Sequence, residues 1–168
     1  GIVKPFLCVH PGGRLLLKRW PVDRYAALCD RLAAQFNWPV VVLGAADEGE
    51  LAARLTAGMR ARAVSLAGKL TMRELGGLLG GAALFICNDS GPMHLAAAMG
   101  TPTVAIFGPS KSDETGAYGD RNKAVEAAMP CRRTCDENSC RHSEFHACMN
   151  SVSVDDVLAA VRTVCRDG

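Results

Sequence analysis

The chain of 168 residues has no apolar run near the roughly 20 residues that a membrane-spanning helix needs. It also has little charge of one dominant sign. Its 19 Lys and Arg residues nearly balance 17 Asp and Glu residues, and no basic stripe points to nucleic acid. No secretory signal pattern opens the chain, since IVKPFLCVH already reads as a strand. We therefore expect a cytoplasmic protein with at most peripheral membrane contact.

Internal repeats and low-complexity tracts are also missing, so we expect one domain that spans residues 1–168. Hydrophobic residues make up 49% of the chain, which is enough for a genuine core. A domain of this size needs no disulfide scaffold. Four of the eight cysteines lie in apolar patterns, where a free thiol behaves as a small hydrophobic side chain: Cys8, Cys29, Cys87 and Cys165.

Strand-like apolar runs alternate with helical patterns along the chain. The strand-like runs cover residues 3–10, 38–45, 61–68, 83–88 and 101–108, and residues 122–129 could form a sixth. The helical patterns cover residues 22–37, 47–59, 71–81, 92–99 and 153–165. The strands are nearly continuous in Val, Ile, Leu and Phe, which is typical of parallel strands buried on both faces. The sequence thus predicts a doubly wound, Rossmann-like α/β fold with ligands at the carboxyl ends of its strands.

The segment CNDSGPMHLAAAM joins the fourth of these strands to its helix. A proline follows Gly91, and proline is favoured at the first helical position, so Gly91 is the expected N-cap. Asp89 and Ser90 then precede a helix start whose N–H groups and dipole suit a phosphate. A hydrolytic triad of Asp89, Ser90 and His94 is disfavoured, because no G-x-S-x-G turn is present and triad members come from separate segments. In the alternative, Asp89 and Ser90 only cap the helix and His94 packs beneath it.

The connection after the first strand, HPGGRLLLKRWP, offers a second candidate for phosphate binding. Gly12 and Gly13 let the backbone approach a ligand closely. Lys18 supplies a positive charge just before the first helix, while Arg19 is expected to point to solvent. Together with the helix start at Gly91, these residues indicate a shared diphosphate site. The alternative is that Lys18 is an ordinary solvated surface charge.

Four segments resemble the carboxyl-terminal half of glycosyltransferase family 9, the ADP-heptose lipopolysaccharide heptosyltransferases and their relatives: LLLKRWPVDRYAAL, VVLGAADE, SLAGKLTMREL and CNDSGPMHLAAAMGTPTVAIFGPS. The likeness runs from about Val9 to the final helix. Its most specific motif is D-[ST]-G-x-x-H followed by G-T-P and F-G-P. The resemblance implies a GT-B arrangement of two Rossmann-like halves, in which the second half holds the nucleotide-sugar. This chain would be that carboxyl-terminal half.

The resemblance also implies roles for the residues singled out above. Lys18 and the backbone N–H groups around Ser90 and Gly91 would bind the phosphates of the nucleotide-sugar, and His94 would lie close to them. Asp89 would accept hydrogen bonds from sugar hydroxyls, because a pyrophosphate would repel its carboxylate.

The nucleoside end of the ligand would be bound by residues after the second and third strands. Leu70 falls where the family lines its adenine pocket, which favours an ADP-sugar. Heptosyltransferases tend to carry an acidic ribose ligand after the second strand, but the aligned residue here is Ala46. Asp47 and Glu48 follow directly and could take its place.

The function implied is an inverting glycosyltransferase of lipopolysaccharide core or related glycan synthesis, with ADP-heptose favoured, a glycolipid acceptor and no cofactor. Such a transfer needs a base that deprotonates the acceptor hydroxyl. In this family that base is a carboxylate of the amino-terminal half, so we expect this chain to be inactive alone and assign no catalytic residue. The alternatives are a non-catalytic nucleotide-binding module and a zinc-stabilised interaction domain.

A cysteine-rich loop at about residues 130–149 contains Cys131, Cys135, Cys140 and Cys148. The spacing C-x3-C-x4-C-x7-C could hold a tetrahedral structural zinc. Because the loop lacks the C-x2-C pairs of common zinc ribbons, free thiols or disulfides are favoured over zinc. No catalytic metal is expected, since a GT-B transferase needs none.

Overall fold

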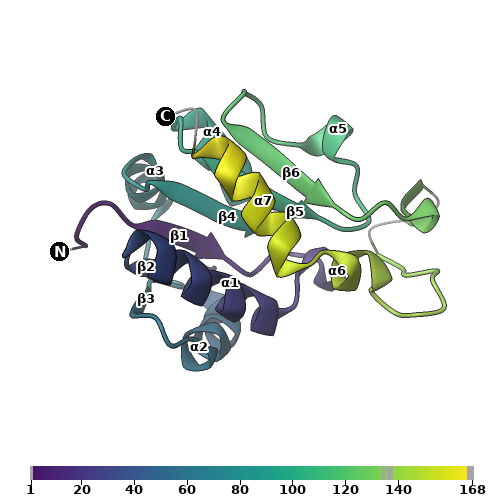
Figure 1. The fold of residues 1–168 in the computed structure, drawn as a ribbon, viewed down its shortest axis with the longest axis horizontal. Helices are drawn as coiled ribbons and strands as arrows, with labels where there is room; N and C mark the ends of the chain where they lie inside the picture. Colours follow the sequence, from purple (N-terminus) through teal and green to yellow (C-terminus); the bar gives the residue numbers. More distant parts are fainter. Residues whose placement is uncertain (1, 134, 136–137, 166–168) are drawn as a thin grey trace.

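The computed structural model describes residues 2–133, 135 and 138–165, and these residues form a six-stranded, fully parallel sheet (Figure 1). Its strands are β1 (Leu7–His10), β2 (Val40–Val42), β3 (Ala63–Ser65), β4 (Leu84–Asn88), β5 (Thr103–Phe107) and β6 (Asn122–Glu126). They lie in the order β3-β2-β1-β4-β5-β6. The chain reverses its direction of winding between β1 and β4. In sheets of this kind, ligands bind at the carboxyl ends of the strands beside such a reversal.

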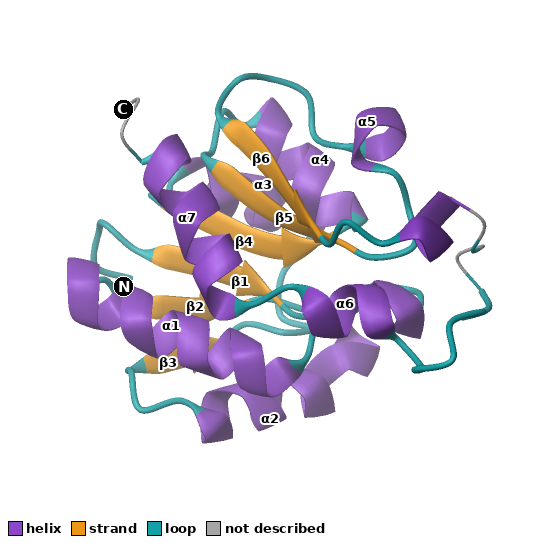
Figure 2. Ribbon diagram, turned by 45° about the vertical axis from the view of Figure 1, so that its right-hand side comes forward, coloured by secondary structure: helices purple, strands orange, loops and turns teal. Residues whose placement is uncertain are grey.

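Helices cover both faces of the sheet (Figure 2). The α-helices are α1 (Val22–Phe36), α2 (Gly49–Gly58), α3 (Met72–Gly80), α4 (Gly91–Ala98), α5 (Ser112–Thr115), α6 (Ala147–Ser151) and α7 (Val154–Val164). Short 3-10 helices are formed by Leu16–Lys18, Ala46–Glu48 and Pro130–Arg133. One apolar cluster lies beneath α1, α2 and α7, and a second lies beneath α3 and α4. None of the helices in the described part of the chain is long and apolar enough to cross a bilayer.

Strand β4 shows why the strands lack an alternating pattern. Leu84 and Ile86 point into the first apolar cluster, while Phe85 and Cys87 point into the second. Successive side chains of a strand face opposite sides of the sheet, so a sheet covered on both sides needs apolar residues at every position. The prediction of a doubly wound α/β fold is confirmed, and residues 122–126 do form the sixth strand.

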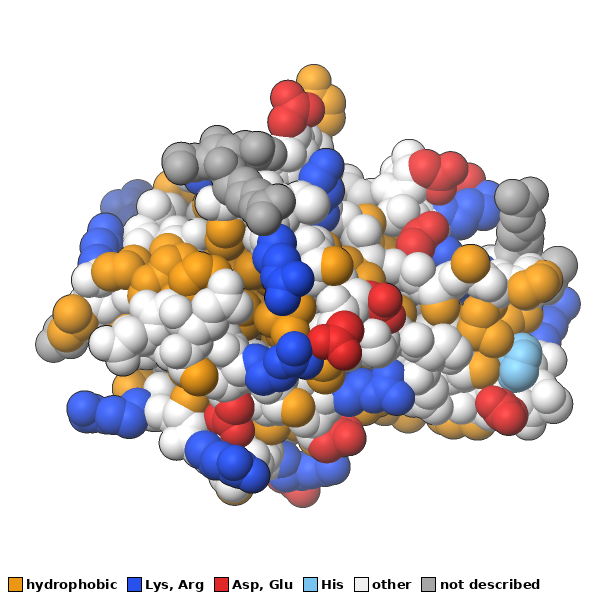
Figure 3. All heavy atoms as spheres, viewed as in Figure 1, with side chains coloured by type: hydrophobic (Ala, Val, Ile, Leu, Met, Phe, Trp, Pro, Cys, Tyr) orange, Lys and Arg blue, Asp and Glu red, His pale blue; other side chains and the backbone are white. Residues whose placement is uncertain are grey.

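Basic and acidic side chains are interspersed over the face shown in Figure 3, as expected for a net charge of +2. The Arg31–Asp155 pair, for example, joins α1 to α7 on the surface, with an N–O distance of 2.7 Å.

The start of α4 differs by one residue from the sequence prediction. Gly91 is the first helical residue, and Ser90 is the N-cap, with extended backbone angles of φ −156° and ψ 162°. Pro92 therefore occupies the second helical position, where its missing N–H and fixed φ are still tolerated. The first helical N–H groups consequently follow Ser90 directly.

Candidate functional site

Three strand-to-helix connections meet at Asp89, just beyond the carboxyl ends of β1, β4 and β5. Nζ of Lys18 lies 2.7 Å from Oδ2 of Asp89, and Oγ of Ser110 donates to the same oxygen at 2.6 Å. Asp89 is buried, with 8% of its surface exposed. The turn that ends at Lys18 thus carries a positive charge to the residue just before Ser90 and α4. The structure brings together the two connections that the sequence analysis predicted to share a site.

A second polar row lies beside this group and crosses three loops. Nε2 of His10 lies 3.0 Å from Oε2 of Glu48, and Nδ1 of the same ring lies 3.3 Å from Oγ of Ser90. His10 and Glu48 are both buried, at 4% and 8% exposure. This row shares the hydroxyl of Ser90 with the disfavoured triad, but its imidazole and carboxylate belong to His10 and Glu48 instead of His94 and Asp89.

Glu48 is held as a carboxylate by several hydrogen-bond donors. The hydrogen bond from His10 is the main cause that lowers the pKa of Glu48 to about 2, against the opposing effect of burial. The backbone N–H groups of Ala45 and Gly13 also donate to it, at 2.8 and 2.7 Å, and lower the pKa further. Glu48 therefore carries a full negative charge at neutral pH.

The glycine pair after β1 makes room for this carboxylate. A Cβ on Gly12 would lie 2.1 Å from Oε1 of Glu48, so any larger residue would displace the side chain. The structure thus shows a close backbone approach at Gly12 and Gly13, and the group approached is Glu48.

Asn88 fixes the loop that carries these glycines. Its side chain is fully buried. Its Nδ2 donates to the carbonyl oxygens of Pro11 and Gly12, each at 2.8 Å. Its Oδ1 accepts from the backbone N–H of Trp20 and the hydroxyl of Tyr25, each at 3.0 Å. One amide therefore ties the loop after β1 to the start of α1.

Three other residues considered in the sequence analysis lie in different surroundings. Leu70 follows β3 and is half-buried against the second apolar cluster, two strands away from β1. His94 is exposed on α4. The expectation that Arg19 points to solvent is wrong: its Nε donates to the carbonyl of Gly13 at 2.8 Å, because the turn at Leu16–Lys18 directs it back over the loop.

The sequence analysis gave His10 and Asn88 no role, and it left open which acid follows the second strand. Asp47 is exposed, whereas Glu48 is buried in the site. A 3-10 turn over Ala46–Glu48 turns the last of these residues inward. The sequence did show a glycine and then two acidic residues after the second strand, but this pattern does not predict which of the two acids faces inward.

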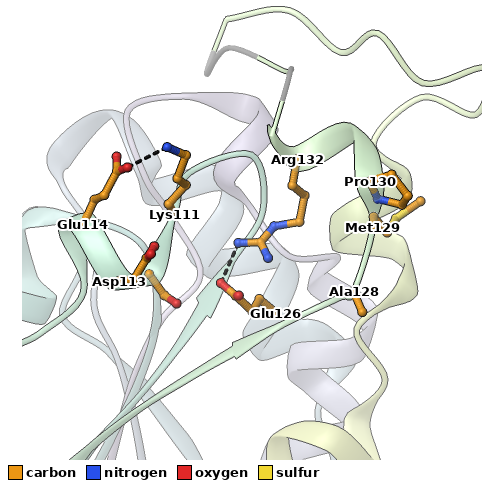
Figure 4. Close-up of a pocket in the computed structure, with 9 residues that line it drawn as sticks. Lys111, Asp113, Glu114, Glu126, Ala128, Met129, Pro130 and Arg132 are labelled. Atoms are coloured by element: carbon orange, nitrogen blue, oxygen red, sulfur yellow. Dashed lines mark hydrogen bonds and ion pairs between the residues drawn. The ribbon is translucent and has the colours of Figure 1, made fainter.

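A cavity of about 780 Å³ lies between the start of α5 and the segment that follows β6 (Figure 4). Ion pairs join Arg132 to Glu126 and Lys111 to Glu114 along its wall. Nη2 of Arg132 also donates to the carbonyl of Ser110 at 2.8 Å, and so connects the cavity to the residue that binds Asp89. The sequence analysis did not predict this cavity.

The cysteine-rich loop brings its thiols near one another. Burial raises the pKa of the Cys148 thiol, and the neighbouring Cys131 and Cys140 raise it further. No disulfide joins any of the eight cysteines, all of which lie within the described residues. Within the described residues, no group of three or more His, Cys, Asp or Glu side chains is arranged to hold a metal ion. Zinc binding by the four cysteines of this loop, which include Cys135, therefore stays a prediction.

The sequence pattern of glycosyltransferase family 9 (heptosyltransferase) matches residues 2–144. This chain belongs to glycosyltransferase family 9. Lipopolysaccharide heptosyltransferase 1 of Pseudomonas aeruginosa is 34% identical to this family 9 chain over 78% of the chain and 38% of the relative. Lipooligosaccharide heptosyltransferase 2 of Campylobacter jejuni is 30% identical over 98% of the chain and 52% of the relative. The chain thus spans between about a third and about a half of the length of these relatives.

Solved structures show the same fold. A family 9 glycosyltransferase from Veillonella parvula covers 100% of the chain with a TM-score of 0.84 and 22% identity, and the match spans 48% of that structure. An E. coli heptosyltransferase solved with ADP covers 96% of the chain with a TM-score of 0.76 and 20% identity, over 46% of that structure. The family 9 chain is therefore a Rossmann-like sheet of the kind that forms half of a GT-B fold.

Proposed function

We propose that residues 1–168 form the carboxyl-terminal, nucleotide-sugar-binding half of an inverting glycosyltransferase that acts in lipopolysaccharide core or related glycan synthesis. The observation that carries this proposal is the 2.7 Å contact between Lys18 and Asp89, which joins a cation to the start of α4 at the carboxyl edge of the sheet. The favoured ligand is ADP-heptose. The acceptor is a glycolipid bound with the help of the other half.

The diphosphate binds between the ammonium of Lys18 and the N–H groups at the start of α4, from Gly91 onward. These groups supply positive charge where the nucleoside diphosphate leaves, and so they stabilise the negative charge that develops on it. Asp89 accepts hydrogen bonds from sugar hydroxyls. Ser110 holds that carboxylate in place, as its 2.6 Å hydrogen bond allows.

Glu48 serves as the acidic ribose ligand that Ala46 cannot supply. Its lowered pKa keeps it anionic. Hydrogen bonds from His10, Ala45 and Gly13 take three of the roughly four acceptor positions of a carboxylate, so one position remains for a ribose hydroxyl. Leu70 contacts the adenine. An E. coli heptosyltransferase solved with ADP supports this choice of nucleotide, since its fold matches the chain with a TM-score of 0.76.

The chain binds the activated sugar but does not transfer it unaided. Transfer needs a base on the acceptor hydroxyl, and we assign that base to a carboxylate of the amino-terminal half. We therefore expect this chain alone to bind the nucleotide without catalysing transfer.

Titration calorimetry of the 168-residue chain with ADP, UDP and GDP tests the proposal. We expect ADP to bind most tightly. Equal or tighter binding of UDP would contradict the choice of adenine, and a chain that binds none of the three nucleotides would contradict the function as a whole.

A further inference from the structure

Around the row Glu48–His10–Ser90 there is one more hydrogen-bond acceptor than neutral His10 and Ser90 have hydrogens to donate. Oγ of Ser90 lies 3.3 Å from Nδ1 of His10 and 3.2 Å from the carbonyl oxygen of Asn88. A serine hydroxyl has a single hydrogen to donate. Within the protein, that hydrogen therefore already has two acceptors to choose between.

The protonation state of His10 decides how many acceptors remain. Glu48 is anionic, so Nε2 of neutral His10 must carry the hydrogen that is donated over 3.0 Å. Nδ1 then holds a lone pair and accepts from Ser90. When His10 is protonated, both ring nitrogens are hydrogen-bond donors. Nδ1 then donates to Ser90, and the serine hydrogen is released from the histidine.

We propose that His10 is a positioning residue which couples nucleotide-sugar binding to the uptake of one proton. With the proton on Nδ1, His10 holds Oγ of Ser90 as an acceptor, and Ser90 directs its own hydrogen to a phosphate oxygen of the ligand. The proton comes from solvent and returns to it on release. This inference rests on the proposed function, because it assumes a diphosphate at the start of α4.

The charged groups near His10 fit this coupling. Glu48 on the turn before α2 contacts the ring directly and stabilises an imidazolium. Arg19 lies beyond that carboxylate, with Nη2 3.8 Å from Oε1 of Glu48. Lys18 and Asp89, the residue that precedes Ser90, form an ion pair with an N–O distance of 2.7 Å. A bound diphosphate adds negative charge to this balance and so favours the protonated ring.

The titratable groups on the remaining neighbours stay neutral. Cys87 on β4 is the register partner of His10, and burial raises the pKa of its thiol well above the usual range. The hydroxyl of Tyr25 on α1 lies 3.4 Å from the carbonyl oxygen of His10, and burial likewise raises its pKa. Histidine is the side-chain type whose charge ordinarily changes near neutral pH.

Titration calorimetry with ADP-glucose tests the coupling. The diphosphate of this ligand is substituted at both ends and does not titrate near neutrality, unlike the terminal phosphate of ADP. Binding is measured between about pH 5.5 and 8 in two buffers that differ in ionisation enthalpy. We expect the number of protons taken up per bound ligand to approach one at the upper end of this pH range. The affinity should fall by up to about tenfold for each unit by which the pH rises.

Three variants identify the groups involved. His10→Gln, which cannot titrate, should abolish proton uptake and make the affinity independent of pH. Ser90→Ala should also lose most of the uptake, whereas simple attraction between an imidazolium and the phosphates would survive it. His142→Gln is the matched control, since His142 lies on the cysteine-rich loop and forms hydrogen bonds with the backbone of Glu144, and full uptake should remain.

The outcomes distinguish failure of this inference from failure of the proposed function. Binding without proton uptake, or uptake that persists in His10→Gln or in full in Ser90→Ala, overturns the role of His10 and leaves the proposed function intact. If ADP binds but ADP-glucose does not, proton uptake is measured with ADP instead. The uptake in His10→Gln then gives the part that comes from the terminal phosphate of ADP, and the remainder is assigned to His10. A chain that binds no adenine nucleotide contradicts the proposed function, and this inference with it.

Discussion

The ammonium of Lys18 lies 2.7 Å from the carboxylate of Asp89, although 71 positions separate the two residues. Both side chains are largely shielded from water, with 15% and 7% of their surfaces exposed. A phosphate that binds Lys18 must therefore share its charge with Asp89. Substitutions of the two residues should therefore have different effects on the binding of the nucleotide and of the sugar.

Lys18→Ala should weaken ADP binding by about ten- to a hundredfold. The substitution removes a charge-assisted hydrogen bond, which contributes roughly 1.5–3 kcal/mol. Titration calorimetry with ADP measures the effect, and adenosine, which has no phosphate, should bind both proteins alike.

Arg14→Ala is the control for this measurement, because Arg14 is exposed on the same loop. Arg19 would be a poor control, since its guanidinium bonds to the backbone of Gly13. Unchanged ADP affinity in Lys18→Ala would show that the ammonium serves only to hold Asp89.

Asp89→Asn should weaken an ADP-sugar while it leaves ADP at least as tightly bound. The amide keeps the size of the side chain but accepts fewer hydrogen bonds from sugar hydroxyls, and it releases Lys18 for the phosphates. Parallel titrations with ADP and ADP-glucose compare the two effects. Equal losses for both ligands would assign Asp89 a structural role at the start of α4.

Asn88→Ala should lower the free energy of unfolding by about 2–4 kcal/mol, because four buried hydrogen-bond partners lose their amide together. Urea denaturation measures the change. Asn150→Ala is the matched control on α6, where the exposed side chain of Asn150 donates a hydrogen bond of 3.3 Å to the carbonyl of Phe145. Its cost should stay within about 0.5 kcal/mol, and a similar loss in both variants would contradict the role of Asn88.

Glu48 should make folding stability depend on pH in the acid range. Its pKa is lowered from 4.5 to about 2 in the folded chain, so its stabilisation is present above about pH 4.5 and is lost as the pH falls towards 2. The loss amounts to about 3 kcal/mol at most. Glu48→Gln should flatten the curve of unfolding free energy against pH in this window. Glu50→Gln, at an exposed position of α2, should leave the curve unchanged.

Local sequence patterns predicted much of the fold. Continuous apolar runs such as residues 83–88 identified strands buried on both faces, because burial on two sides removes the need for polar alternation. The site motif was equally visible, since Asp89, Ser90 and the proline after Gly91 are neighbours in the chain. The N-cap was misplaced by one residue, because glycine and serine are both accepted at that position.

What the chain order could not reveal were the contacts among side chains from separate connections. The sequence by itself determined the parallel α/β sheet and the presence of Lys18 and Asp89 beyond the carboxyl ends of its strands. Only the tertiary structure decided that Glu48 rather than Asp47 turns inward, that His10 joins it to Ser90, and that Arg19 folds over Gly13. The physical reason is that hydrophobic periodicity reports burial along one segment, whereas buried polar partners are chosen by the geometry of several loops at once.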